Sequence, residues 1–280
     1  MKSILTILLL TAFNQPPTEK AEVFAKGSIS TGLIEHSAPA YSPSMDLVVW
    51  GVVEGPGKPA RIMEMKKENG TWTTPASVSF SSPDKDDFYP RFSPDGRTLY
   101  FTSRRPLPAG FPPLADMWIW SVQQTKNGWS EPAPLAQSIC EGYEYSHSVS
   151  KKGTMVYSFR KENGKVFDLA MIANGKREVL PAPINTNGYE DGPYISPDES
   201  FLIFESDRPG GRGSNDLYIC FRQKDGQFGT PINMGDRINT QHSERFAGLS
   251  PDGKILFFGS DRSGPDVYWI SAGVIEELRK

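Results

Sequence analysis

The chain has 280 residues, of which 22% are charged, and its formal net charge at pH 7 is -3. A weakly acidic chain has no general electrostatic reason to bind nucleic acid or an anionic membrane surface. Its 26 Gly and 24 Pro favour a turn-rich all-β protein, and its two Cys exclude a disulfide framework.

The N-terminus has the pattern of a secretory signal. Met1-Lys2 supplies a positive start, and an apolar run follows over residues 4–10. The run is too short to span a bilayer as a mature helix. We therefore expect residues 1–21 to be a signal peptide and leader. The mature protein is then periplasmic or secreted, without membrane insertion.

A unit of roughly fifty residues, a length typical of propeller and solenoid repeats, occurs five times in the chain. Each copy begins at a register serine, and these serines are Ser42, Ser93, Ser150, Ser196 and Ser250. In four copies a proline follows the serine. The third copy instead has Lys151-Lys152-Gly153, so its turn departs from the pattern.

Each unit predicts four antiparallel strands. Apolar and polar residues alternate before and after the serine turn, which indicates the first and second strands. The third strand opens with Asp, as in Asp216-Leu217-Tyr218. A hairpin signal such as Asp225-Gly226 then precedes the fourth strand. Four-stranded blades arranged in a ring form a β-propeller. We predict an all-β propeller over residues 22–273, with five blades most favoured and six as the alternative, and a short tail over 274–280.

The two ends of the chain predict how the ring closes. The fifth unit has three strands before the tail and lacks a convincing fourth. The segment 27–31 is similar to 235–240, which ends a fourth strand in the preceding unit. An N-terminal strand that completes the last blade would remove two exposed sheet edges.

These motifs resemble a known repeat. Ser-Pro-Asp-Gly, followed by a Leu-Tyr-Phe-x-Ser-x-Arg strand and then Asp-Leu-Tyr, is similar to the WD40-like repeat in the C-terminal propeller of TolB. The resemblance covers about residues 23–271 and is strongest over 183–271. It implies a periplasmic binding protein of the cell envelope. The TolB propeller has six blades, whereas five copies are present here.

Five positions suggest a ring of ligand-binding residues. The residues six before each register serine are His36, Asp87, Glu144, Glu190 and Glu244, and Glu35 replaces His36 if the first unit is shifted by one. The first strand of each blade lines the axial channel, so these acids would form a ring near one mouth of it. Such a ring could bind a divalent cation such as calcium, or a basic group of a partner.

A structural role competes with this interpretation. Twelve residues after the serine lie Arg105, Arg208 and Arg262, whereas the first and third units have Glu54 and Glu162 there. The second strand runs back beside the first, so these arginines would emerge on the same face as the acids. Bidentate pairing of acid with arginine would then brace neighbouring strands.

The favoured function is a non-enzymatic binding scaffold for a protein or envelope component, acting as a monomer. The alternative is a lyase or hydrolase that acts on an acidic polysaccharide with the help of a metal. That alternative needs Glu144 and His147, with His36 and His242 near the same rim, to converge on a metal ion.

Overall fold

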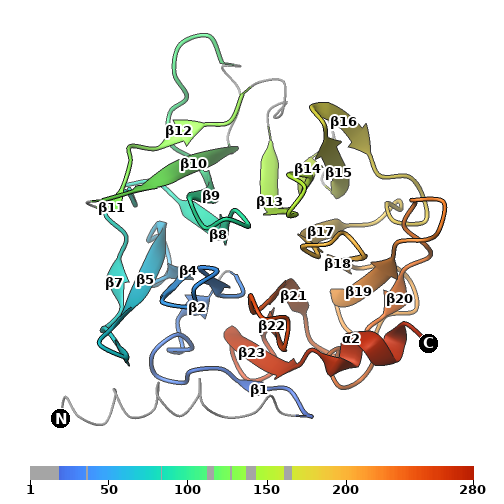
Figure 1. The fold of residues 1–280 in the computed structure, drawn as a ribbon. Helices are drawn as coiled ribbons and strands as arrows, with labels where there is room; N and C mark the ends of the chain where they lie inside the picture. The colour runs from blue at the N-terminus through green and yellow to red at the C-terminus, as the bar shows by residue number, and fades with distance from the viewer. Residues whose placement is uncertain are drawn as a thin grey trace.

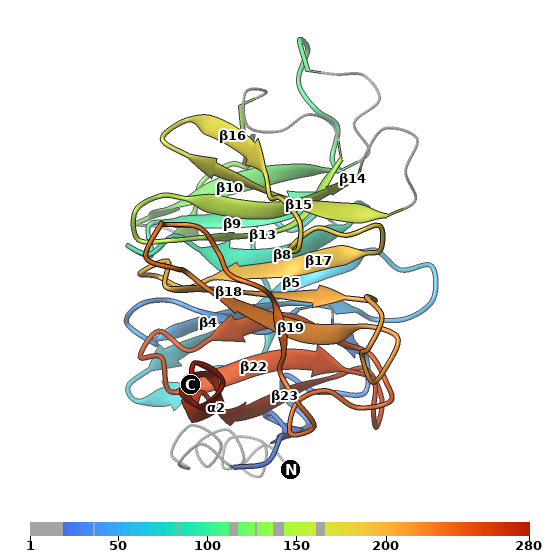
Figure 2. The same cartoon turned by 90° about the vertical axis from the view of Figure 1, so that its right-hand side faces the viewer.

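Five antiparallel sheets are arranged radially around one axis in the computed structural model (Figure 1). The structure describes residues 19–35, 37–82, 84–111, 117–126, 128–136, 143–160 and 166–280. We number the blades 1 to 5 in the chain order of their register serines. The five-bladed prediction is confirmed, and the side view shows the sheets stacked face against face (Figure 2).

Blades 1 and 2 have strands that are split into short pieces. In blade 1 the inner pieces β2 and β3 both pair with β4, and the outer pieces β6 and β7 both pair with β5. The strands of blade 1 are β2 (Ile34–Glu35), β3 (Ala40–Tyr41), β4 (Leu47–Val53), β5 (Ala60–Glu68), β6 (Thr71–Trp72) and β7 (Ala76–Ser77). Those of blade 2 are β8 (Asp87–Phe92), β9 (Thr98–Ser103), β10 (Trp118–Thr125), β11 (Gly128–Trp129) and β12 (Ala133–Pro134).

Blades 3, 4 and 5 are four-stranded sheets with the strands in simple order from the axis outward. Blade 3 contains β13 (Glu144–Val149), β14 (Met155–Arg160), β15 (Phe167–Ala173) and β16 (Lys176–Val179). Blade 4 contains β17 (Glu190–Ile195), β18 (Phe201–Ser206), β19 (Asp216–Phe221) and β20 (Ile232–Asn233). Blade 5 contains β21 (Glu244–Leu249), β22 (Ile255–Ser260), β23 (Asp266–Ser271) and β1 (Glu22–Val23).

The hydrophobic core lies between neighbouring blades. Because each middle strand is covered on both faces, all six residues of β18 are buried. One cluster joins Val156 and Leu169 of blade 3 to Leu202 and Phe204 of blade 4. Such packing between sheets fixes each blade relative to the next and so holds the inner strands around the axis.

The N-terminal segment closes the ring, as the sequence predicts. In β1, Glu22 pairs with Trp269 and Val23 pairs with Tyr268 of β23. The Ser30 hydroxyl donates to the Val267 carbonyl at 3.2 Å and accepts from the Val267 amide at 3.1 Å. The strand itself lies at Glu22–Val23, and the segment 27–31 forms the turn that follows it.

The C-terminal tail forms a short helix, α2 (Gly273–Leu278), that packs beside blades 4 and 5. Val274 and Ile275 of the helix are buried in the same cluster as Phe201 and Ile270. In the part of the chain that the structure describes, no helix has the length and apolar character to cross a membrane.

Candidate functional site

The inner strands give the propeller two different ends. The inner strands of blades 2 to 5 start at the acid position, the inner strand of blade 1 has Glu35 as its second residue, and a register serine and its turn follow in every blade. We call the first end the acid end, defined by Glu35, Asp87, Glu144, Glu190 and Glu244. We call the other end the turn face, defined by the turns that begin at the five register serines.

At the acid end, Glu190 is enclosed within its own blade. Its side chain is fully buried and accepts hydrogen bonds from the Thr186 amide at 2.9 Å, the Thr186 hydroxyl at 2.7 Å and the Ser206 hydroxyl at 2.9 Å. Arg208 donates to it at 3.3 Å, and the Arg208 guanidinium also lies over the rings of Phe204 and Tyr218. The carboxylate thus ties the loop before β17 to the end of β18.

Asp87 and Glu244 have the same arrangement in blades 2 and 5. Arg105 contacts both carboxylate oxygens of Asp87 at 2.9 and 2.8 Å, and Arg262 contacts Glu244 at 3.2 Å. Both acids are fully buried. Three of the candidate ring acids therefore each pair with the arginine that the sequence places opposite them. Charge-assisted hydrogen bonds of this kind satisfy a buried carboxylate and hold neighbouring strands together.

Blade 1 has Glu35 at the equivalent position. Glu35 accepts from the Thr31 amide at 3.1 Å and the Thr31 hydroxyl at 2.9 Å, as Glu190 does from Thr186. No arginine of the described residues pairs with it, because Glu54 occupies that offset and lies 3.9 Å from the partly buried Arg61. Burial raises the pKa of Glu35 to about 7. His36 lies outside the described residues. Glu144 is buried at the start of β13.

The two described histidines lie in different surroundings. His147 is 1% exposed and sits beside the ring of Tyr100, and burial, together with the positive charge of Arg91, lowers its pKa to about 3. His242 is at the surface, 3.8 Å from Asp261. Within the described ranges, no three side chains of His, Cys, Asp or Glu form a group that could hold a metal ion.

Aromatic side chains fill the middle of the axis. Tyr89 and Phe246 lie four residues before their register serines, at β-bulges where both have positive φ. Their ring centroids are 4.6 Å apart, and Tyr145 lies 4.8 Å from Tyr89. Blades 2 and 5 are separated by blade 1, so a contact between them crosses the axis. Rings from blades 2, 3 and 5 therefore meet near the axis, between the acid end and the turn face.

On the turn face, a pocket of about 350 Å³ opens around the axis and is lined by residues of all five blades. The position two before the register serine is occupied by Ala40, Arg91, Ser148, Tyr194 and Gly248. Four of these five residues line the pocket. Equivalent backbone positions therefore present different side chains to the same space.

Arg91 reaches across the axis at the floor of this pocket. Its guanidinium donates from Nη1 to the Ala38 carbonyl at 3.0 Å and from Nη2 to the Ala247 carbonyl at 3.1 Å. A Cβ added at Gly248 would lie 3.4 Å from Nη1, an ordinary van der Waals contact, so the guanidinium lies directly beside this backbone position. Burial lowers the pKa of Arg91 to about 10, which keeps it charged at neutral pH.

The rim of this axial pocket is formed by the serine turns. Pro43, Pro94, Pro197 and Pro251 follow four of the register serines, and Lys151 takes the equivalent place in blade 3. Among the described residues that line the pocket, Arg91 and Lys151 carry the charge, and none is acidic. Arg91 also forms no ion pair with a carboxylate in the described part of the chain.

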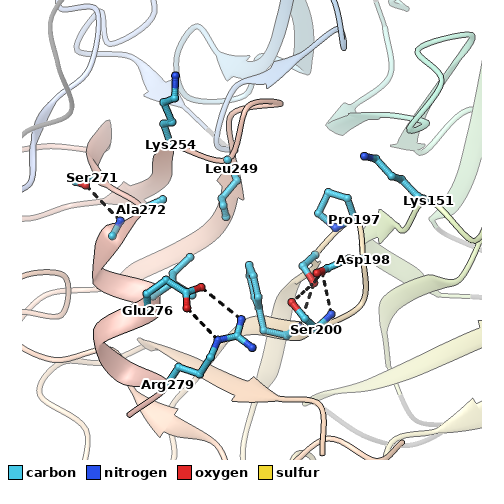
Figure 3. A pocket seen from close by; sticks show the side chains of 15 residues that line it. Lys151, Pro197, Asp198, Ser200, Leu249, Lys254, Ser271, Ala272, Glu276 and Arg279 are labelled. Atoms are coloured by element: carbon cyan, nitrogen blue, oxygen red, sulfur yellow. Dashed lines mark hydrogen bonds and ion pairs between the residues drawn. The ribbon is translucent and has the colours of Figure 1, made fainter.

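A second hollow of about 720 Å³ adjoins the pocket beside α2 (Figure 3). We call it the α2 groove. Lys151, Pro197 and Leu249 line both spaces, so the groove continues the axial pocket outward between blades 4 and 5. On the helix side, Glu276 pairs with Arg279 at 3.2 Å.

Sequence reasoning directed attention to the acid end and missed the turn face. Two signals for the turn face were present. Lys151 interrupts the Ser-Pro pattern, and Arg91 occupies a position where the other units have Ala, Ser, Tyr or Gly. Recognising them required knowing that these positions converge on one pocket.

Comparison with known proteins supports the fold. No protein-family model matches the sequence, and no curated protein matches it. Solved structures similar to this chain include a protein assigned as TolB from Agrobacterium tumefaciens, with 20% identity and a TM-score of 0.55. TolB from Acinetobacter baumannii has 15% identity and a TM-score of 0.52. A gluconolactonase from Xanthomonas campestris has 12% identity and a TM-score of 0.47.

The extent of these matches limits them to the fold. The first alignment covers 82% of this chain and 71% of the Agrobacterium protein, and the second covers 84% of this chain and 53% of the Acinetobacter protein. The third covers 91% of this chain and 96% of the gluconolactonase. At such identities, a shared propeller does not carry an activity from one protein to another.

Proposed function

We propose that this protein is a non-enzymatic scaffold that binds a protein partner through the axial pocket and the α2 groove on its turn face. The observation that carries the proposal is the axial pocket, where four of the five equivalent strand positions place unlike residues around one space. Positions that brace the fold repeat along the chain, as the acid and arginine pairs do. Positions that differ between repeats yet meet in one concave space are those available for recognition.

The acids at the acid end then have a structural role. Asp87, Glu190 and Glu244 are fully buried, and each has an arginine partner in its own blade. A buried carboxylate that already accepts several hydrogen bonds has few remaining lone pairs for a cation or a partner. We propose that these acids brace the strands and that the ligand contacts lie at the opposite end.

Export to the periplasm or the cell exterior is part of the same proposal. It is supported by the signal-like pattern of the first residues and by the resemblance of the repeat to that of TolB. A single propeller whose N-terminal strand completes its own last blade also needs no second copy to cover its edges. We therefore propose a monomer that acts in the cell envelope.

Charge reversal on each end tests the choice of face. Lys151→Glu changes the turn face, and Lys85→Glu changes an exposed lysine near Asp87 at the acid end. Tagged wild type and both variants are incubated with envelope extract from the native cells, and the amount of each retained protein is quantified by mass spectrometry. We expect one partner to be retained equally by wild type and Lys85→Glu and reduced several-fold by Lys151→Glu. Loss with Lys85→Glu alone would place the partner at the acid end and refute the proposal.

A further inference from the structure

We propose that the partner is held by a C-terminal carboxylate, which pairs with the guanidinium of Arg91 at the floor of the axial pocket. The residues before this carboxylate would pass Pro197 and Leu249 and lie in the α2 groove. This inference rests on the proposed function and specifies the chemistry of the same site.

The unused donors of Arg91 point to an anion. A guanidinium has five N–H donors, and two of those on Arg91 are given to the Ala38 and Ala247 carbonyls. Carbonyl groups bind the donors without neutralising the charge. A half-buried cation without a carboxylate partner gains more from an anion than an exposed cation does, because solvent screens it less. The planar fork of arginine matches the two oxygens of a carboxylate.

The walls of the pocket favour an apolar group next to that carboxylate. Pro39, Tyr41, Phe92 and Leu249 line it together with the turn prolines. Its volume of about 350 Å³ lies at the lower end of the range of small-ligand sites. One or two terminal residues of a peptide with an apolar side chain fit that size and that surface. A sugar would instead require many convergent hydrogen-bonding side chains.

Charge in the pocket lining supports the same ligand. The chain has a net charge of -3, yet the axial pocket is lined by the two cations Arg91 and Lys151 and by no acid among its described residues. Lys151 is exposed at the mouth, where proline stands in four other blades. The rim turns also carry Asp46, Asp95, Asp198 and Asp252, which accept hydrogen bonds from their own register serines and do not line the pocket. The attraction for an anionic chain end therefore comes from the two cations of the lining.

The shared wall of the two hollows gives the rest of the peptide a path. Pro197 and Leu249 line both spaces, so a chain that leaves the axial pocket between blades 4 and 5 passes these two residues as it enters the α2 groove. Phe201 and Ile275 supply apolar surface there, and Lys254 and Asp198 supply charge of both signs. A compact organic acid would leave this groove empty, whereas an extended peptide uses it.

The test compares two libraries of random heptapeptides that differ only in the chemical group at the peptide C-terminus. One library ends in a free carboxylate and the other in a carboxamide, and binding to the folded, untagged protein is measured by affinity selection and then by titration of the selected peptides. We expect selected acid peptides to bind about 30-fold or more tightly than their amide counterparts, as is typical when one partner of a desolvated ion pair is removed. Benzoate and an oligosaccharide of uronic acids are titrated in parallel.

Variants then locate the carboxylate. Arg91→Met should reduce the affinity of acid peptides to that of the amides and leave the affinity of the amides unchanged. Unchanged amide binding also shows that the variant has folded and that its groove is intact. Lys151→Ala should weaken acid peptides about 2- to 5-fold, as expected for an exposed charge. Lys152→Ala removes the neighbouring lysine, which lies outside both spaces and pairs with Glu199, and should have no effect.

The outcomes separate this inference from the proposed function. Equal binding of acid and amide peptides, with loss on Lys151→Glu, would refute carboxylate recognition and leave the turn face as the binding surface. Benzoate binding as tightly as any peptide would show that the site takes a small organic acid, which refutes the peptide. Tight binding of the uronic acid oligosaccharide with no selected peptides would refute it as well. An acid preference that survives Arg91→Met would refute the role of Arg91.

Discussion

Substitution of Glu35 by Gln should stabilise the protein above pH 7 and leave it nearly unchanged below pH 4.5. Glu35 accepts hydrogen bonds from Thr31 as Glu190 does from Thr186, but no arginine in the described part of the chain pairs with it. Its side chain is 7% exposed, and its Oε2 has no hydrogen-bond partner among the described residues. Burial is the main reason that its pKa is raised to about 7, and the nearby carboxylate of Asp266 adds to the effect.

The sign and the size follow from proton linkage. The ordinary pKa of the group is 4.5 and the folded value is about 7, so the folded state binds the proton more tightly than the unfolded state. The resulting stabilisation is complete below pH 4.5 and is lost as the pH rises through 7. At about 1.4 kcal/mol per pKa unit, the loss amounts to about 3 kcal/mol. Gln resembles the protonated acid and removes this dependence.

Chemical denaturation between pH 4 and 8 measures the effect. The relevant quantity is the difference in the free energy of unfolding between Glu35→Gln and wild type. Other buried acids with raised pKa values, such as Asp191 and Glu205, cancel in this difference. Glu54→Gln, at an exposed carboxylate of the same blade, serves as the matched control for the loss of a carboxylate. A difference that is constant across the pH range would refute the reasoning.

Three further predictions concern the fold. Arg208→Met should destabilise the protein by about 3–5 kcal/mol, because it leaves the buried Glu190 carboxylate without its counter-charge. The control Arg104→Met, in an exposed pair with Asp86, should cost less than about 1 kcal/mol. Urea titrations measure both values. Phe24→Ala should lower the free energy of unfolding by about 3–5 kcal/mol, because the buried Phe24 ring packs 4.9 Å from that of Phe257. Hydrogen exchange should show faster opening of β23 in particular. Equal acceleration in all blades would contradict the closure of the ring by the N-terminal segment. In a Cys140→Ser background, Cys220 should resist thiol reagents until the protein unfolds, because burial raises its thiol pKa to about 12; rapid reaction of the native protein would contradict its burial.

The fold could be predicted from the sequence because it depends on features that repeat. The Ser-Pro turns, the Asp at the third strand and the hairpin signals mark the same strand order in each unit, and a local error in one copy is corrected by the others. The closing strand was predicted from the missing fourth strand of the last unit. Its position at Glu22–Val23 was not, because a strand of two residues has no alternating pattern to detect.

The acid and arginine pairs were also predictable, since both follow from a fixed offset to the register serine. Whether Glu35 or His36 occupies the first position could not be decided from spacing, because blade 1 contains an additional residue between its inner strand pairs. In blade 1, Glu35 and Ala40 are five positions apart and pair with Val52 and Val49, which are three apart. In blade 2, Asp87 and Arg91 are four positions apart and pair with Ser103 and Tyr100, which are also three apart. That difference is a property of the bulge and has no separate sequence signal.

The axial pocket could not be predicted from the sequence, because it forms only where residues from all five blades come together in space. Residues far apart in the chain meet only when the ring closes, and the bulges decide which side chain at each strand faces the axis. The buried carboxylate of Asp191 illustrates the same limit. It accepts hydrogen bonds from Ser146 and Ser158 of the neighbouring blade, and no motif in the sequence relates these three residues.

The most direct test of the account is a crystal structure of the protein with the tightest acid peptide from the library. We predict that the terminal carboxylate lies within hydrogen-bond distance of the Arg91 guanidinium and that the preceding residues contact Leu249 and α2. A peptide bound at the acid end, or on the outer edge of a blade with Arg91 uncontacted, would contradict the account.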